Sequence, residues 1–272
     1  MIDAAMPYLR CPVCSGTLAR AGERTLRCPR GHSFDIARQG YASLTHRGTP
    51  HEGDSAAMIA DRAAFLAAGH YDFISEALTG SLAEAEPAGL VVDAGTGTGF
   101  YLAHVLDALP GWSGLGLDVS KPALRRAARA HPRAAAVLAD LWQPIPLADA
   151  AAGLILNVFA PRNGPEFRRI LGPGGKLLVV TPAADHLHEL IAAFQLIRVD
   201  PDKAGRVADS LLPHFTPERT TTHRRTMTLT GTELRTLIGM TPSARHTPLD
   251  GLPAESLRVT AAIDLTTYRS DG

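Results

Sequence analysis

The sequence predicts an α/β protein in which a small N-terminal zinc ribbon precedes a Rossmann-like domain with a mostly parallel sheet and an antiparallel last strand. Apolar strand-like runs alternate with helix-like stretches from Leu90 onward, and a glycine-rich loop follows the first run. All three cysteines of the 272 residues lie between positions 11 and 28. Strands alternating with helices form a parallel sheet. We expect the ribbon over residues 1–45, a linker and helix over 46–70, and the α/β domain over 71–272.

The composition is that of a folded protein: 45% of the residues are hydrophobic and 20% are charged. The net charge is zero, so no global field attracts nucleic acid, although residues 1–50 carry seven arginines against three acidic residues. No apolar run approaches the length of a membrane span and no apolar signal core begins the chain, so we expect a cytoplasmic protein without membrane contact.

The ribbon is predicted from the spacing of the thiols. Cys11 and Cys14 form a C-x-x-C pair, and after 13 intervening residues Cys28 and His32 form a C-x-x-x-H pair. Two such pairs on facing turns supply the tetrahedral sulfur and nitrogen ligands of zinc. The segment between them, TLARAGERTLR, is predicted to be a hairpin turning over residues 21–24. Because protein ligands fill all four positions, the predicted zinc is structural; free cysteines beside a surface histidine are the alternative that this spacing disfavours.

The glycine-rich loop follows a predicted strand over residues 90–92. Asp93 ends this strand, and Gly95, Gly97 and Gly99 lead into a helix that runs to about residue 109. The spacing is G-x-G-x-G, whereas dinucleotide-binding domains have G-x-G-x-x-G. Glycines let the backbone approach a ligand closely, and a carboxylate beside the loop suits S-adenosylmethionine rather than a pyrophosphate.

Acidic residues end the next two predicted strands. GLGLDVS ends in Asp118, which would accept hydrogen bonds from ribose hydroxyls, and AAAVLAD ends in Asp140, where the adenine commonly lies. The fourth strand, AAGLILNVF, ends at Asn157, and the turn LGPGG introduces the fifth. In this order the features predict a class I methyltransferase domain that binds S-adenosylmethionine.

The C-terminal part is predicted to complete the sheet and cover the donor site. Residues 182–216 are expected to form a helical cover. RTTTHRRTMTLTG and SLRVTAAIDLTTY are expected to be antiparallel final strands around the helix TGTELRTLIGM.

Several segments resemble the 23S rRNA guanine-N1 methyltransferases of the RlmA type, specifically the actinobacterial branch that includes the tylosin-resistance methyltransferase. They are the Cys-Cys-Cys-His ribbon, GHSFDIARQGYASL, GDSAAMIADRAAFLAAGHYDFI, NVFAPRN, RRILGPGGKLLVVTP and DHLHEL. The resemblance covers nearly the whole chain. It implies methylation of N1 of a guanine in a 23S rRNA hairpin near the macrolide-binding tunnel, and macrolide resistance as a consequence. It also implies that Tyr71, Tyr101, Leu102 and His186 contact the methyl donor.

The acceptor site is less defined by the sequence. Asn157, Arg162 and Asn163, at the end of the fourth strand, are our candidates for gripping the target base; a capped loop before the helix at Glu166 is the equal alternative. The sequence identifies no base for the guanine N1 proton. We expect 23S rRNA as partner, docked by the ribbon arginines Arg10, Arg20, Arg24, Arg27, Arg30, Arg38 and Arg47.

Other functions are compatible with the same sequence. The ribbon could instead cover the donor pocket or mediate homodimerisation. The same scaffold could methylate a small molecule, which an enclosed aromatic pocket without a basic channel would indicate. A zinc-ribbon RNA-binding protein without catalysis is a third reading, which the full set of Asp93, glycine loop and Asp118 disfavours.

Overall fold

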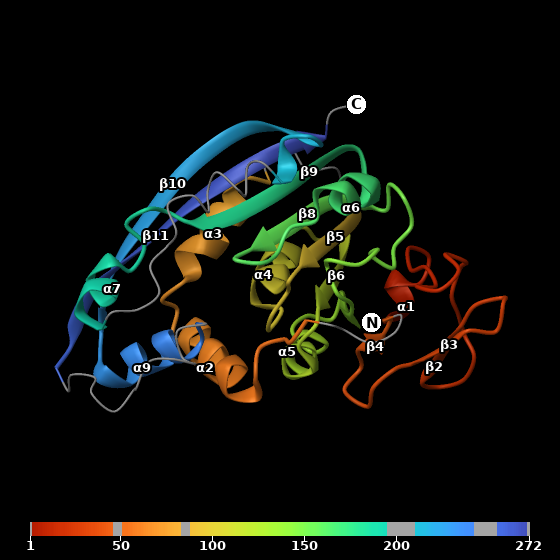
Figure 1. Cartoon of the computed structure of the whole chain (residues 1–272), viewed down its shortest axis with the longest axis horizontal. Helices are drawn as coiled ribbons and strands as arrows, with labels where there is room; N and C mark the ends of the chain where they lie inside the picture. Colours follow the sequence, from red (N-terminus) through yellow and green to blue (C-terminus); the bar gives the residue numbers. More distant parts are fainter. Residues whose placement is uncertain (1, 46–50, 83–87, 195–209, 242–254, 271–272) are drawn as a thin grey trace.

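The computed structural model of the chain describes residues 2–45, 51–82, 88–194, 210–241 and 255–270. They form an eight-stranded sheet with the strand order β10-β11-β9-β8-β5-β6-β7-β4 (Figure 1). Strands β5 to β9 are mutually parallel, whereas β11 is antiparallel to β9 and β10 is antiparallel to β11. The predicted fold class is confirmed: the last strand of the chain, β11, is the antiparallel one, and β10 at the edge runs in the same direction as β9. The strands are β4 (Ala42–Ser43), β5 (Gly89–Ala94), β6 (Trp112–Asp118), β7 (Ala134–Leu138), β8 (Ala152–Val158), β9 (Leu171–Pro182), β10 (Phe215–Leu229) and β11 (Leu257–Ser270).

The sheet differs from the expectation at the predicted turn before the fifth strand and agrees with it at the final strands. The predicted turn LGPGG lies inside β9, where the pairing with β8 shifts register between Ala152 and Leu154. The predicted final strands do flank a helix, α9 (Gly231–Gly239), which begins with a capping box between Thr230 and Glu233. Of the expected helical cover over residues 182–216, α7 (His188–Phe194) is described, β10 takes up the last two residues, and residues 195–209 lie outside the described ranges.

The two faces of the sheet bury different partners, because alternate residues of each strand point to opposite faces. Val91 of β5 packs with helices on one face, whereas its neighbours Leu90 and Val92 pack on the other, with α6 (Gly164–Ile170) and the ribbon. The helices on the first face are α2 (Ala56–Ala67), α3 (Asp72–Gly80), α4 (Phe100–Ala108) and α9, while α5 (Lys121–Ala127) packs on β6 and β7 (Figure 1). In the described ranges no helix is long and apolar enough to cross a membrane.

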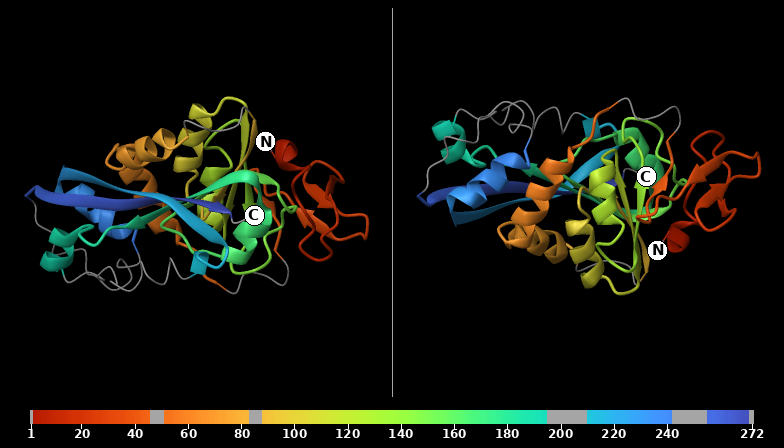
Figure 2. Two further views of the ribbon diagram at one scale, coloured as in Figure 1. Left: turned by 90° about the horizontal axis from the view of Figure 1, so that it is seen from above. Right: turned by 90° about the horizontal axis from the view of Figure 1, so that it is seen from below.

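The ribbon contains the predicted hairpin. After the short helix α1 (Ile2–Ala5), strands β1 (Ala19–Arg20), β2 (Thr25–Arg27) and β3 (Ser33–Asp35) form an antiparallel sheet. The ribbon lies at the end of the molecule opposite α7 (Figure 2). Its buried residues Leu18, Leu26 and Phe34 belong to the same apolar cluster as Leu115 and Val137 of the large sheet. The ribbon and the large sheet therefore share one core.

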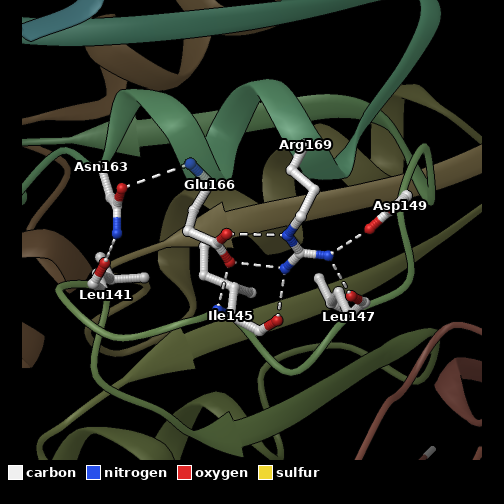
Figure 3. A network of polar contacts seen from close by, with 7 residues as sticks. All are labelled: Leu141, Ile145, Leu147, Asp149, Asn163, Glu166 and Arg169. Atoms are coloured by element: carbon white, nitrogen blue, oxygen red, sulfur yellow. Dashed lines mark hydrogen bonds and ion pairs between the residues drawn. The ribbon is translucent and has the colours of Figure 1, made fainter. Parts of the chain in front are cut away.

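Backbone hydrogen bonds also join the ribbon to the loop between β7 and β8. Arg10 N donates to Pro146 O at 2.9 Å, and Ala148 N donates to Tyr8 O at 2.8 Å. Arg169 of α6 holds this loop in place (Figure 3). Its guanidinium donates to the carbonyl oxygens of Ile145 and Leu147 at 2.8 and 2.7 Å and to the carboxylates of Glu166 and Asp149.

Part of the expected linker is held against the large sheet. Ser120 Oγ donates to Asp54 O at 2.7 Å, and a Cβ on Gly53 would lie 2.7 Å from Ser120 Cα. Residues 51–55 therefore pack against the carboxyl end of β6, whereas 46–50 lie outside the described residues. Strand β4, at the end of the expected ribbon, pairs with β7 of the large sheet.

Candidate active site and metal centre

The structure brings the four predicted metal ligands together. The ligand atoms of Cys11, Cys14, Cys28 and His32 all lie within 4.8 Å of one another. The Cys14 and Cys28 Sγ atoms are 3.7 Å apart, and His32 Nδ1 lies 3.6 Å from Cys11 Sγ and 3.3 Å from Cys28 Sγ. A zinc tetrahedron with ordinary Zn–S and Zn–N bonds has edges of about 3.8 Å between sulfurs and about 3.6 Å between sulfur and nitrogen. The donor set and its spacing therefore fit a zinc ion.

The knuckle after Cys28 also favours a metal-binding thiolate. Burial raises the pKa of Cys28, but backbone N–H groups of His32 and Arg30 and the Cys14 and His32 side chains lower it more, to about 6. Burial raises the pKa of Cys11. Since zinc binds the deprotonated thiol, the ion would release the remaining protons on binding.

The glycine-rich loop connects β5 to α4 at the carboxyl end of the sheet. Gly95 N and Thr96 N both donate to Leu117 O at 2.9 Å, and Gly99 begins α4. Gly95 has a φ of +86°, in the left-handed region that favours glycine. A Cβ on Gly95 would lie 2.3 Å from the Cβ of Ala160, in the loop after β8. The first glycine is thus required both for the turn and for the close approach of the two loops.

Asp93 is the buried carboxyl group beneath this loop. It is 1% exposed and accepts a hydrogen bond from Thr96 Oγ1 at 2.7 Å. Burial raises its pKa to about 7; the Thr96 hydrogen bond lowers it and the charge of Asp118 raises it further. A cation bound beside Asp93 would favour the ionised carboxylate.

Asp118 and Asp140 lie at the ends of adjacent strands, as predicted. Asp118 accepts backbone hydrogen bonds from Ser120 at 2.7 Å and from Gly97 at 2.8 Å, which fix the carboxylate against the glycine loop. Asp140 is 5% exposed and accepts from Trp142 N at 3.0 Å, while His51 Nδ1 lies 2.8 Å from its other oxygen. Both carboxylates keep lone pairs for further donors.

The four residues that the resemblance implies as contacts of the methyl donor lie before α3, in α4 and before α7. The ring centroids of Tyr71, before α3, and His186, before α7, are 6.4 Å apart. Burial lowers the pKa of His186 to about 4, so its ring is neutral at pH 7. Burial raises the pKa of Tyr101, and the charges of Tyr71 and Asp93 contribute to the shift. The Leu102 side chain lies in the core, so any ligand contact there would be made by its backbone.

The three acceptor candidates lie at the end of β8 and in the loop before α6, as expected, and their polar atoms are engaged to different degrees. Asn157 is fully buried, and its Nδ2 donates to Ala94 O at 3.1 Å and Pro161 O at 2.8 Å, so it joins the two loops. Asn163 is the N-cap of α6: it accepts from Glu166 N and donates to Leu141 O (Figure 3). Burial lowers the pKa of Arg162 to about 10, and the interaction with Tyr268 partly offsets this shift. Asn163 therefore serves as a helix cap, which was one of the two predicted roles. Asn157 Oδ1 and Arg162 Nε have no hydrogen-bond partner among the described residues, so these two remain candidates for contacting the target base.

Comparison with known proteins identifies the family. The model of the RlmA N-terminal zinc ribbon matches residues 9–45. A Micromonospora griseorubida protein named for 23S rRNA guanine-N1 methylation is 56% identical over 97% of this chain and 98% of its own. The chain belongs to the 23S rRNA (guanine-N1)-methyltransferase family. The Streptomyces fradiae 23S rRNA (guanine(748)-N1)-methyltransferase is 52% identical over 90% of this chain and 88% of its own.

Solved structures agree with the fold. A chain from the complex between the Haloferax volcanii Trm112 methyltransferase activator and a methyltransferase has a TM-score of 0.53 at 16% identity, with 82% of this chain and 100% of that chain covered. As a member of this family the chain is an S-adenosylmethionine-dependent methyltransferase, and the family ribbon together with the Cys-His cluster makes zinc its structural ion.

Three residues near the site were not predicted from the sequence. Arg62 of α2 pairs with Asp54 at 2.7 Å and reaches the glycine loop, where a Cβ on Gly97 would lie 3.4 Å from Arg62 Nη1. His51 covers Asp140 from the expected linker. Phe159, after β8, is exposed beside His186. Arg62 and Phe159 lie in segments that carried the resemblance, and Phe159 lies between the acceptor candidates Asn157 and Arg162, but none of the three was itself predicted to be part of the site.

Proposed function

We propose that the protein transfers the methyl group of S-adenosylmethionine to N1 of a guanine in 23S rRNA. The observation that carries the proposal is that a complete donor loop lies in a chain 52% identical to the Streptomyces fradiae enzyme named for guanine 748. Position 748 is therefore the first position to map. Macrolide resistance is the proposed consequence for a cell that carries this modification.

The proposed donor site uses the carboxyl ends of three strands. Gly95, Gly97 and Gly99 would hold the amino-acid part by close backbone approach, with Asp93 beneath the loop. Asp118 would accept the ribose hydroxyls, and Asp140 would lie beside the adenine. Tyr71, Tyr101, His186 and the backbone of Leu102 would complete the pocket.

The proposed zinc ligands are Cys11, Cys14, Cys28 and His32. They fill a tetrahedral shell without leaving a position for water, so the ion would act structurally. Its effect would extend beyond the ribbon, because Cys11 and Cys28 lie in the same apolar cluster as the strands of the large sheet.

The donor supplies an activated methyl group on a sulfonium, and the protein supplies position. Asn157 fixes the loop after β8 to the end of β5, and Ala160 lies against Gly95. An acceptor base resting on that loop would meet the methyl group held by the other loop. Holding two reactants at contact distance removes much of the entropic barrier to a displacement. The neutral His186 ring adds no positive charge that would repel the sulfonium.

The ribbon supports RNA docking through fewer arginines than the sequence suggested. Arg20 is engaged by Asp3, and Arg10 donates to backbone carbonyls at 2.8 and 3.0 Å. Arg27 donates to Ser33 Oγ at 3.0 Å, whereas the side chains of Arg24, Arg30 and Arg38 are exposed and make no hydrogen bond or ion pair within the described part of the chain. These three would neutralise phosphates, with affinity falling as salt rises. Arg47 lies outside the described residues.

The test is direct methylation of RNA by the purified, zinc-loaded protein. Unmodified 23S rRNA and labelled S-adenosylmethionine should give label at one guanine, with N1 methylation stopping reverse transcription there. Asp118→Ala should abolish the label while leaving the zinc content unchanged. Label only in small molecules from a source-organism extract would keep the donor site and overturn the acceptor. Raised macrolide tolerance of a host expressing the protein, but not Asp118→Ala, would support the resistance role.

A further inference from the structure

We propose that Phe159 is the surface on which the target guanine stacks during methyl transfer. The inference rests on the proposed function and deepens it, because it assigns a surface for the face of the base on the loop that also carries the predicted acceptor residues. Four observations carry it: the exposure of the ring, the strain of its backbone, the anchoring of its loop to the donor loop, and the aromatic neighbours.

The exposure of Phe159 is unusual for its place in the fold. It follows a strand whose last residues are buried, with Asn157 at 0% and Val158 at 8% exposure, and it precedes Ala160 at 9%. Phe159 itself is 40% exposed. An aromatic side chain left open at the carboxyl end of a parallel strand lies where ligands of α/β sheets bind. The exposed part of the Phe159 ring is not packed in the core, so it does not stabilise the fold by burial.

The backbone holds the ring outward at an energetic cost. Phe159 has a φ of +53°, one of four non-glycine residues with positive φ in the described ranges. For a bulky residue this conformation is an outlier, and such strain concentrates at functional sites. The hydrogen bond from Phe159 N to Val180 O, 3.1 Å long, holds the residue in place.

The loop that carries Phe159 is in contact with the donor loop. Ala160 Cβ lies 2.3 Å from the position that a Cβ on Gly95 would occupy. Asn157 Nδ2 bridges Ala94 O and Pro161 O, one on each loop. A base stacked on Phe159 would therefore rest on a loop that packs directly against the proposed donor loop.

The neighbouring rings define the surroundings of a base bound at Phe159. The His186 ring lies 5.9 Å from that of Phe159 at an interplanar angle of 45°, so the two rings do not stack face to face. His186 in turn lies 6.4 Å from Tyr71. Every nucleobase has a π face, and enzymes that modify bases bind an unstacked base against aromatic side chains. Phe159 offers such a face without polar atoms, so it would bind the base and leave recognition of its edge to other groups.

Substitutions at Phe159 test the stacking role. Phe159→Ala should lower kcat/KM for the unmodified rRNA roughly 5- to 150-fold, the range for loss of one base–aromatic stack. Affinity for S-adenosylmethionine, measured by calorimetry, should stay within about twofold because the proposed donor contacts are elsewhere. Phe159→Tyr and Phe159→Trp should retain most of the activity of the unaltered protein. Phe159→Leu, which keeps the apolar bulk and the backbone strain but lacks a π face, should not.

Phe159→Gly separates the ring from the strain, because glycine adopts a positive φ readily. It should be as inactive on RNA as Phe159→Ala. The stacking role would be overturned if Phe159→Ala methylated the RNA as fast as the unaltered protein, or if Phe159→Leu were as active as Phe159→Tyr. These results are distinguishable from failure of the proposed function, in which the unaltered protein would not methylate rRNA at all.

Discussion

The contact between Gly95 and Ala160 predicts a specific energetic coupling between the donor loop and the loop after β8. In Gly95→Ala, the residue would keep a φ of +86°, which costs an L-residue about 1–2 kcal/mol. Its Cβ would also lie 2.3 Å from the Ala160 Cβ, and overpacking of this kind costs about 1–3 kcal/mol. The free energy of unfolding should therefore fall by about 2–5 kcal/mol.

A second substitution and a matched control separate the two costs. Ala160→Gly removes the contacted Cβ, so the double variant should recover about 1–3 kcal/mol and keep the backbone cost. Gly174→Ala is the control for strain alone, because Gly174 has a φ of +72° and nothing within 4 Å of its Cβ position; it should lose only about 1–2 kcal/mol.

Urea unfolding of the four proteins and the parent gives the free energies, and calorimetry gives donor affinity, which Gly95→Ala should lose. If Gly95→Ala were no less stable than Gly174→Ala, or Ala160→Gly gave no recovery in the double variant, the two loops would not touch as described.

Two further predictions concern Asp93 and zinc. Because burial raises the pKa of Asp93 from 3.8 to about 7, its proton stays on in the folded state while the unfolded chain loses it. The stabilisation present below pH 4 should therefore be lost as pH rises from 4 to 7, by on the order of 4 kcal/mol, and Asp93→Asn should abolish this dependence in urea titrations at pH 5 and pH 8. Donor affinity should rise with pH over the same range, since the cationic donor favours ionised Asp93, and a flat affinity profile would contradict the placement of the carboxyl group beside the donor. Removal of zinc by a chelator should lower the thermal midpoint of the whole chain in a single transition, because the ribbon shares its core with the large sheet; a ribbon melting alone, with the α/β domain unchanged, would refute the shared core.

The parts of the fold that are encoded locally were predictable. The ribbon follows from four ligands within 22 residues, and the donor site follows from a glycine loop and acidic residues at strand ends. Each signal lies in one short segment, and the parallel sheet brings the segments to one edge without further information.

The contacts that were missed join residues far apart in the chain. His51 and Asp140 are 89 positions apart, and Arg62 reaches Met240 across 178. From the sequence, Asn163 was equally compatible with contacting the target base and with capping a helix. Its hydrogen bonds to Glu166 N and Leu141 O settle its position as a cap, and those partners depend on how α6 packs on the preceding loop. A role for Phe159 was not predicted, because the inference depends on the exposure and the φ of this residue, which composition and spacing do not encode.

The position and chemistry of the transferred methyl group show most directly whether the protein methylates N1 of a guanine in 23S rRNA. Unmodified 23S rRNA would be incubated with the protein and S-adenosylmethionine, digested to nucleosides for mass spectrometry and mapped by reverse transcription. We expect one 1-methylguanosine per rRNA, a single stop at one guanine, and neither signal with Asp118→Ala. Intact donor binding with no methylated guanine in the RNA, or methylation at an atom other than N1, would contradict this expectation.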